Sequence, residues 1–312
     1  MPSLEAVNLS KEYGSFTAVS NLNIKVEGAK CVGFLGPNGA GKTTTLKMFT
    51  ALIKPSSGKA LINGIDVHKQ KEKALEYVGA LIETPEIYPS LTAREALKMI
   101  AEIRGVPRSE RQKRIEYAIA EVKMDEWIDK RVNKFSKGMK QRICIASALL
   151  SDPSVILLDE PTSGLDPRGM SEVREIIKSL KNHQRLIFMS SHILSEVADV
   201  CDEVAMFDRG KLVIYDTLSK VTAKASDGEN IVEVGLRRSI TPEIISKTRS
   251  ISGVKSVDEK DGTTMRVYFA GGVDVQEQIL ADIFKLKIRL ISFKPASSAL
   301  EEAYMKLVTG GK

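Results

Sequence analysis

The sequence predicts an α/β fold with a mainly parallel sheet, followed by a smaller α+β domain. Apolar runs that are typical of buried strands, such as residues 31–35 and 155–158, alternate with helical patterns up to about residue 218. A glycine-rich loop joins one of these strands directly to the next predicted helix. This alternation favours a parallel sheet covered by helices. After about residue 220 the order of predicted strands and helices is different, which indicates a separate domain.

The loop after residues 31–35 fits the pattern G-x-x-x-x-G-K-[ST], whose glycines allow backbone N–H groups to surround a phosphate. A helix is predicted at residues 43–52, with Leu46, Phe49 and Leu52 on one face, and its N-terminus adds partial positive charge. The pattern predicts an ATP site in which Lys42 contacts the β- and γ-phosphates and Thr43 binds Mg²⁺. The nucleotide is expected to contact Gly36, Pro37, Asn38, Gly39, Ala40, Gly41, Lys42, Thr43 and Thr44.

Two carboxylates, Asp159 and Glu160, follow the apolar run at residues 155–158. A parallel strand brings such groups to the carboxyl edge of the sheet, where ligands bind. Alone, an acidic pair after an apolar run is an ordinary strand end, but the phosphate loop upstream favours a catalytic role. We expect Asp159 to bind Mg²⁺ and Glu160 to orient or deprotonate the attacking water, because phosphoryl transfer depends mainly on positioning and charge stabilisation.

The segment Phe135-Ser136-Lys137-Gly138-Met139 resembles the signature sequence of the nucleotide-binding subunits of ABC transporters. It is a variant of the usual Leu-Ser-Gly-Gly-Gln in which Ser136 and Gly138 are retained. The resemblance implies that this segment contacts the γ-phosphate of ATP bound to a second subunit, so that two ATP molecules lie between two ATPase subunits. Ser136 also fits the N-cap of a helix at residues 139–150, and both interpretations are compatible because a helix N-terminus is itself an anion site.

Three further positions match the same family. Asp166 resembles the aspartate that couples the two sites, and a solvated turn before Pro167 is the alternative. His192, just after the apolar strand at residues 186–189, resembles the switch histidine that hydrogen-bonds to the γ-phosphate and steadies the attacking water; a surface histidine is the alternative. Tyr13 matches the aromatic residue that stacks on adenine.

Glu83 stands where most ABC subunits carry Gln. Glu also offers an oxygen to Mg²⁺ and to the water, so we expect Glu83 to be a Mg²⁺ ligand. Unlike Gln, it adds a negative charge beside the metal, which changes the partners that the group prefers. Residues 83–92 are similar to the corresponding stretch of exporter-type ABC ATPases, notably the drug, antibiotic and sodium efflux group. In that family the stretch lines the groove that receives a short helix of the membrane subunit.

Size and composition indicate a globular protein. The chain has 312 residues, of which 43% are hydrophobic and 28% charged, which is enough for two domains. No run approaches the roughly 18 apolar residues of a membrane helix, so the chain is not expected to span a bilayer. The start runs directly into a predicted strand without a basic and apolar leader, and we expect the protein to stay inside the cell.

Charge and cysteine content exclude other classes of function. The net charge of +6 is diluted by 40 acidic residues, and nucleic acid is not expected as a partner. The densest basic run, at residues 108–114, is predicted to be the solvated face of a helix. Cys31, Cys144 and Cys201 are scattered and lie in apolar surroundings, which predicts buried thiols rather than disulfides or a metal site.

The predicted domains are an ATPase domain at residues 1–220 with a helix-rich insert at about 91–150, a linker of small and polar residues at 221–230, and an accessory domain at 231–312. The accessory domain shows strands at 231–236, 254–257, 265–269 and 288–293 and helices at 242–251 and 275–284, with a hairpin turn at Asp261-Gly262. The order βαββαβ predicts a ferredoxin-like unit. A last helix at 299–308 resembles the tail helix of exporter-type subunits, and dimer contact or regulation is the expected role.

These features predict an ATP-hydrolysing motor subunit of an ABC transporter. Two copies, or this chain with a related ATPase subunit, are expected to close over two Mg·ATP and drive separate integral membrane permease subunits, with export as the expected direction. The protein would then lie at the cytoplasmic face of the membrane as a peripheral subunit. The transported substrate is not predicted, because the membrane subunit selects it.

Two alternatives remain at this point. A soluble ABC-type ATPase could act on a cytoplasmic macromolecule, although translation-type members carry two nucleotide domains and DNA-repair members carry long coiled coils before the signature. A structural regulator with an inactive site is disfavoured, because Lys42, Asp159, Glu160 and His192 are all present.

Overall fold

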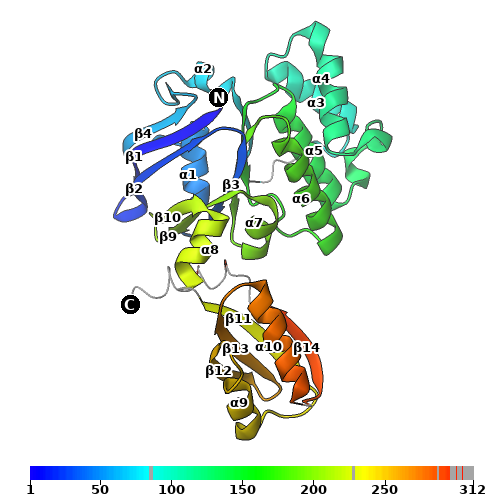
Figure 1. Ribbon diagram of the computed structural model, residues 1–312. Helices are drawn as coiled ribbons and strands as arrows, with labels where there is room; N and C mark the ends of the chain where they lie inside the picture. Colours follow the sequence, from blue (N-terminus) through cyan, green and yellow to red (C-terminus); the bar gives the residue numbers. More distant parts are fainter. Residues whose placement is uncertain (84–86, 227–228, 287, 296–299, 301–303, 305–312) are drawn as a thin grey trace. The chain divides into compact units, whose positions relative to one another are not determined.

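The structure is a computed structural model that describes residues 1–83, 87–226, 229–286, 288–295, 300 and 304. The chain forms two compact units, Met1–Leu218 and Ser219–Lys312 (Figure 1). Each unit has its own hydrophobic core. The sheets are likewise separate, because none of them takes strands from both units in the described part of the chain.

The first unit alternates strands and helices. Its strands are β1 (Ser3–Tyr13), β2 (Phe16–Glu27), β3 (Lys30–Leu35), β4 (Ser57–Ile62), β5 (Ile65–Asp66), β6 (Val78–Leu81), β7 (Val155–Asp159), β8 (Leu186–Ser191), β9 (Glu203–Asp208) and β10 (Lys211–Thr217). Its helices are α1 (Lys42–Phe49), α2 (Lys71–Leu75), α3 (Ala93–Ile103), α4 (Arg108–Glu121), α5 (Lys137–Leu149), α6 (Pro167–Lys181) and α7 (Leu194–Val200), with short 3₁₀ helices η1 (Asp125–Trp127) and η2 (Val132–Lys134).

The described strands of the first unit form two sheets. The larger has the strand order β10-β9-β3-β8-β7-β6, and the smaller, with order β2-β1-β4-β5, is antiparallel. Strands β9, β3, β8, β7 and β6 run parallel, whereas β10 is antiparallel to β9. Every residue of β8 is buried, as expected for a strand covered on both faces. The prediction of a mainly parallel sheet is confirmed.

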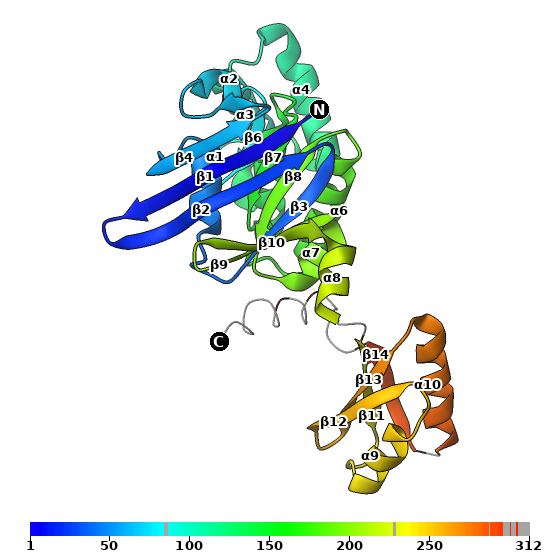
Figure 2. The same ribbon diagram turned by 60° about the vertical axis from the view of Figure 1, so that its left-hand side comes forward.

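Helix α1 packs into a core that both sheets share (Figures 1 and 2). Phe34 of β3 lies at its centre, with its ring centroid 5.2 Å from that of Phe188 in β8 and 4.7 Å from that of Phe207 in β9. Phe49 of α1 also packs against Phe188, with their ring centroids 6.5 Å apart. These contacts hold the carboxyl end of β3, where the glycine loop begins, firmly in the sheet.

Helix α1 is shorter than predicted. It ends at Phe49, and the backbone then turns at Ala51, whose φ is 52°. Leu46 and Phe49 are buried as expected, but Leu52 is 62% exposed. The prediction for Leu52 is wrong, because helical spacing no longer orients a side chain once the chain has left the helix.

Helices α3, α4 and α5 lie between β6 and β7 in the chain and pack against one another (Figure 1). Helix α3 begins with a capping box, in which the Thr92 side chain accepts from the Glu95 N–H and the Glu95 carboxylate accepts from the Thr92 N–H at 2.8 Å. Residues 108–114 of α4 are exposed or half-buried, while its buried side chains are Ile115, Ala118 and Ile119. The predicted solvated basic face is confirmed.

The second unit contains β11 (Glu229–Leu236), α9 (Pro242–Arg249), β12 (Val254–Asp261), β13 (Thr264–Ala270), α10 (Val273–Lys285) and β14 (Leu290–Pro295). The order βαββαβ is the predicted one, and the strands form one antiparallel sheet in the order β12-β13-β11-β14. Its core joins Val232, Val234 and Val267 of the strands to Ile279 and Ile283 of α10. The last predicted helix, at residues 299–308, lies outside the described residues apart from 300 and 304.

Most of the predicted linker is helical. Helix α8 spans Leu218–Ser226, and strand β11 begins at Glu229, so the expected linker at 221–230 is wrong over most of its length. Val221 is fully buried, which gives the helix an anchoring contact. Small residues such as those at 221–226 are compatible with a helix as well as with a turn, because Ala has the highest helix propensity.

Glu233 of β11 is a buried acid on the sheet face opposite the hydrophobic core. It is 4% exposed and pairs with Lys260 at 2.6 Å and Arg266 at 3.4 Å. The hydrogen bond from Lys260 holds the pKa of the Glu233 carboxyl below its usual value. The alternation of β11, with Val232 and Val234 on the other face, places this acid outside the apolar core.

All three cysteines are buried thiols outside any disulfide, which confirms the prediction of buried thiols. Cys31 in β3 and Cys201 after α7 are not isolated from each other, because their Sγ atoms lie 3.6 Å apart. Burial raises the pKa of the Cys144 thiol to about 11, so this group stays protonated and inert at neutral pH.

We expect Phe34→Ala to lower the free energy of unfolding of the first unit by about 3–5 kcal/mol, because it opens a cavity between two other phenylalanine rings. Guanidinium unfolding followed by the fluorescence of Trp127, the one tryptophan of the chain, reports on this unit alone. Phe34→Leu is the control and should cost less than half as much. A change below about 1 kcal/mol for Phe34→Ala would contradict the central role of this ring.

Candidate nucleotide-binding site

Three segments that are far apart in the sequence meet at one edge of the parallel sheet. Strand β8 pairs with β3 on one side and with β7 on the other, and the last pairs are Leu35 with Ser191 and Asp159 with Ser190. The Gly36 N–H also donates to the Ser191 carbonyl at 3.2 Å. Because these strands are parallel, the phosphate loop, the acidic pair and His192 all begin at this edge.

The phosphate loop approaches neighbouring backbone closely at two glycines. A Cβ atom on Gly36 would lie 2.1 Å from the carbonyl oxygen of Phe207, and one on Gly41 would lie 2.3 Å from that of Ala18. Gly41 also has a φ of 105°, in the left-handed region that favours glycine. The turn into α1 therefore needs glycine at both positions.

Lys42 is the first residue of α1 and is only 4% exposed. Its ammonium group donates to the carbonyl oxygens of Gly36 at 2.8 Å and Pro37 at 3.0 Å. The same group lies 3.5 Å from Oε1 of Glu160. The lysine thus supplies a positive charge beside the loop and the N-terminus of α1, which is where an anion binds.

Ser190 connects the two acidic residues. Its hydroxyl donates to Oδ1 of Asp159 at 2.6 Å and accepts from the backbone N–H of Glu160 at 2.9 Å. Ser190 is fully buried at the end of β8, so this hydroxyl has little freedom to turn away. It fixes the orientation of the Asp159 carboxylate and of the backbone that carries Glu160.

The Glu160 carboxylate lies between a lysine and a histidine. Its Oε2 is 3.2 Å from Nδ1 of His192, and its Oε1 is 3.5 Å from Nζ of Lys42. Glu160 has a φ of 44°, an uncommon conformation for a residue with a side chain, and such strain is typical of functional sites. A partly exposed carboxylate in this position is placed to accept a proton from water.

A cavity of about 280 Å³ lies beside the loop. Its lining residues are Tyr13, Phe16, Ala18, Asn38, Gly39, Gly41, Lys42, Thr43, Thr44 and Glu160. Tyr13 and Phe16 are partners in the β1–β2 pairing and are 49% and 61% exposed. Aromatic rings that are exposed at a phosphate site can stack on a planar base. Gly36, Pro37 and Ala40 of the predicted set belong to the loop but do not line this cavity.

The donor set at this edge fits Mg²⁺. The Thr43 hydroxyl and the Asp159 carboxylate are oxygen ligands, which Mg²⁺ prefers, and Mg²⁺ commonly uses one or two protein groups together with phosphate and water. Among the described residues, no group of three or more His, Cys, Asp and Glu side chains forms a site for a metal by itself. The ion would therefore depend on the nucleotide for part of its coordination.

The structure places Glu83 apart from this cavity. Its carboxylate pairs with Lys47 of α1 at 2.5 Å, and its side chain is 66% exposed. Glu83 follows the end of β6 with a φ of 60°. The residues that line the cavity include neither Glu83 nor Asp159. A carboxylate, unlike Gln, is attracted to a nearby ammonium group, which explains the pairing with Lys47. The expectation that Glu83 binds Mg²⁺ stays a prediction.

Ser136 and Gly138 lie at the N-terminus of α5. Ser136 is the N-cap, and its hydroxyl accepts from the Met139 N–H at 3.2 Å, which confirms this interpretation. Asp166 is likewise the N-cap of α6, and its carboxylate accepts from the Gly169 N–H at 3.1 Å. A Cβ on Gly138 would lie 3.4 Å from Cα of Gly169, so the two helix N-termini adjoin. None of these residues lines the cavity at the phosphate loop.

Two contributors to this site were missed from the sequence. Ser190 received no predicted role, although a serine near the end of a buried strand that pairs with an acidic strand end is a sign of a positioning role. Phe16 lies across the hairpin from Tyr13 and lines the same cavity. An exposed aromatic residue three positions after another, with Gly14 between them, was the available signal.

Comparisons with known proteins agree with this geometry. The family model described as ABC transporter matches residues 19–163, and a model of an AAA domain matches residues 129–198. The chain is 37% identical over 317 residues to the bacitracin transport ATP-binding protein BcrA of Bacillus licheniformis, an alignment that covers 99% of this chain and 98% of that protein. The chain belongs to the ABC transporter ATP-binding proteins.

Other members of the ABC family match about 70% of the chain. The lantibiotic transport ATP-binding protein SrtF of Streptococcus pyogenes is 39% identical over 212 residues, covering 68% of this chain and 89% of that protein. A solved structure of an ATP-binding subunit of an ABC transporter is 30% identical, with a TM-score of 0.63 over 71% of this chain and 92% of that one. As an ABC ATP-binding subunit, the chain is an ATPase with an ABC-type P-loop fold.

We expect Ser190→Ala to lower kcat for ATP hydrolysis by about tenfold or more while changing KM little, because it releases Asp159 and the Glu160 backbone without touching the cavity. Steady-state phosphate release measures both constants. Ser191→Ala is the control, since that hydroxyl bonds Glu196 at 3.0 Å and not the acidic pair. Equal losses in both variants would contradict a positioning role for Ser190.

Proposed function

We propose that two copies of this chain enclose two ATP molecules and hydrolyse them to drive a transporter. The observation that carries this proposal is the division of the site within one chain. Lys42 and His192 each contact Glu160, which lines the cavity, whereas Ser136 and Gly138 do not line it. A second copy that presents its α5 N-terminus to the cavity would supply the missing γ-phosphate contacts.

The proposed hydrolysis uses the geometry of Glu160. The loop N–H groups and Lys42 bind the β- and γ-phosphates, and Tyr13 and Phe16 hold the base. Glu160 accepts a proton from the water that attacks the γ-phosphorus, ADP leaves with the bridging oxygen, and His192 hydrogen-bonds to the γ-phosphate. Mg²⁺, held by Thr43 and Asp159, would neutralise charge on the phosphate oxygens. Ser190 keeps Asp159 in position for that role.

The membrane partner is part of the same proposal. The described residues contain no helix with the length and apolar character of a membrane span. BcrA and SrtF are both named as transport ATP-binding proteins, for bacitracin and for a lantibiotic. These relationships support separate permease subunits, export of an antibiotic-like compound and a peripheral position at the cytoplasmic face of the membrane. Asp166, beside Gly138 at the N-terminus of α6, would couple the two ATP sites.

A soluble ATPase that acts on a cytoplasmic macromolecule is the competing function. Purification of the tagged chain from the membranes of its own cells separates the two. The proposed function predicts co-purification of the chain with an integral membrane protein, and ATP hydrolysis that the permease alters.

Glu160→Gln should reduce ATP hydrolysis by about a hundredfold or more, because an amide cannot accept the proton from water. ATP binding should remain, and the ATP-bound chain should migrate as a dimer in size-exclusion chromatography. Phosphate release and elution volume measure the two effects. Normal turnover in this variant would remove Glu160 from its assigned role.

A mixture of two inactive variants tests the shared site. Lys42→Ala removes the phosphate contact and Ser136→Arg blocks the opposite surface, so each variant alone should be inactive. When both are co-expressed, half of the random dimers are mixed and each holds one complete site, so roughly a quarter of the wild-type activity should return. Absence of any recovery, in dimers shown to be mixed, would contradict the two-copy site.

A further inference from the structure

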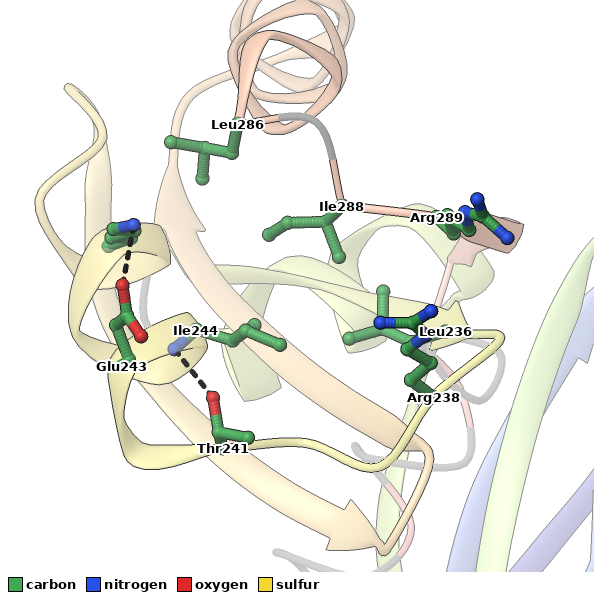
Figure 3. A pocket seen from close by; sticks show the side chains of 9 residues that line it. Leu236, Arg238, Thr241, Glu243, Ile244, Leu286, Ile288 and Arg289 are labelled. Carbon is green, nitrogen blue, oxygen red and sulfur yellow. Dashed lines mark hydrogen bonds and ion pairs between the residues drawn. The ribbon is translucent and has the colours of Figure 1, made fainter.

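The second unit contains a cavity of about 350 Å³ that is unrelated to the nucleotide site (Figure 3). It lies between the end of β11, the N-terminal half of α9 and the segment that joins α10 to β14. Its lining residues are Leu236, Arg238, Thr241, Glu243, Ile244, Lys247, Leu286, Ile288 and Arg289. The volume is within the range of small-molecule sites, which is roughly 300–1,000 Å³.

One part of the cavity wall is aliphatic. Leu236 is 3% exposed and belongs to the core of the unit, while Ile244, Leu286 and Ile288 pack against that core but are only partly buried. Figure 3 shows the side chains of Leu236, Ile244 and Ile288 directed toward the same space. The core is therefore open here, and an apolar group that entered would contact four aliphatic side chains and leave water.

The other part of the wall is cationic. Arg238 and Arg289 both line the cavity, and both side chains are exposed to solvent. Within the described ranges, neither arginine forms an ion pair with an acidic group. The acid in the lining, Glu243, is already paired with Lys247 at 2.7 Å. Among the described residues of the lining, three cationic groups stand against one acid, an excess of two positive charges.

Strand pairing brings the segment that carries Arg238 beside the segment that carries Arg289. Strands β11 and β14 pair in register up to Gly235 with Ser292, and the register then shifts so that Leu236 opposes Leu290. The pairing continues beyond this irregularity, because the Arg237 N–H donates to the Arg289 carbonyl at 2.9 Å. Irregularities of this kind redirect side chains and occur near binding sites. Arg238 follows Arg237 directly, so adjoining segments carry two like charges that favour an anion in the cavity.

We propose that this cavity binds a small amphipathic anion, a carboxylate with a short aliphatic body. The aliphatic body lies against Leu236, Ile244 and Ile288. The carboxylate accepts hydrogen bonds from the guanidinium groups of Arg238 and Arg289, which suit the geometry of a carboxylate. The proposal concerns the second unit alone and does not depend on the transport function.

Octanoate is the probe, titrated into the full-length chain by isothermal titration calorimetry with saturating MgADP to occupy the phosphate loop. A dissociation constant below about 1 mM is expected for a ligand of this size. Arg238→Gln and Arg289→Gln should each weaken binding by about fivefold or more, because each removes a charge-assisted hydrogen bond. Arg237→Gln is the matched control, since it removes the same charge from the adjacent position and that side chain does not line the cavity.

Two further measurements keep the result independent of variant folding. Octan-1-ol has the same chain length without the charge, and it should bind the wild-type protein at least about fivefold more weakly. In the wild-type protein, octanoate should shift the methyl NMR signals of Ile244 and Ile288.

Several results would overturn the proposal. One is that octanoate at 5 mM gives neither heat of binding nor methyl shifts. Another is that Arg237→Gln and Arg238→Gln weaken octanoate binding equally. A third is that octan-1-ol binds the wild-type protein as tightly as octanoate. If the chain sedimented with phosphatidylglycerol vesicles, lost this binding in Arg238→Gln and did not bind free octanoate, the arginines would be assigned to a membrane surface instead.

Discussion

The pairing of β8 with both β3 and β7 is the constraint on which the nucleotide site depends. It sets Leu35 against Ser191 and Asp159 against Ser190, so three chain segments reach the same edge of the sheet. Ser190 then bonds the Asp159 carboxylate and the Glu160 backbone at once. The strained φ of Glu160 is kept because the strand, the hydroxyl and the neighbouring Lys42 and His192 together leave the residue few other positions.

In the proposed function, one chain is not a complete enzyme, and the remaining geometry fits that proposal. The α5 N-terminus carries Ser136 as an N-cap and adjoins the α6 N-terminus at Gly138 and Gly169. The two helix ends offer partial positive charge away from the cavity of their own chain. In the proposed dimer this charge is satisfied by the ATP of the other copy, so ATP itself joins the two subunits. Glu83 would have to leave Lys47 in order to bind a metal ion at this edge.

Much of the fold and of the site could be predicted from the sequence because it depends on local patterns. Apolar runs predicted β3, β7 and β8, and the βαββαβ order of the second unit followed from alternation and one Asp-Gly turn. The predictions for Leu52 and for the 221–230 segment were wrong for a common reason. Both lie where a helix begins or ends, and there packing, such as that of Val221, outweighs local composition. Ser190 and Phe16 were missed because their partners come from other strands.

By itself the sequence determined the chemistry of this protein, since the phosphate loop, the acidic pair and the signature segment each need particular residue types at fixed spacing. The tertiary structure alone decided which of these groups meet. It brought Glu160 to Lys42 and His192, paired Glu83 with Lys47, and opened the core of the second unit beside Arg238 and Arg289. The physical reason is that spacing along a chain sets local conformation, whereas contacts between distant segments follow from strand register and the packing of whole elements.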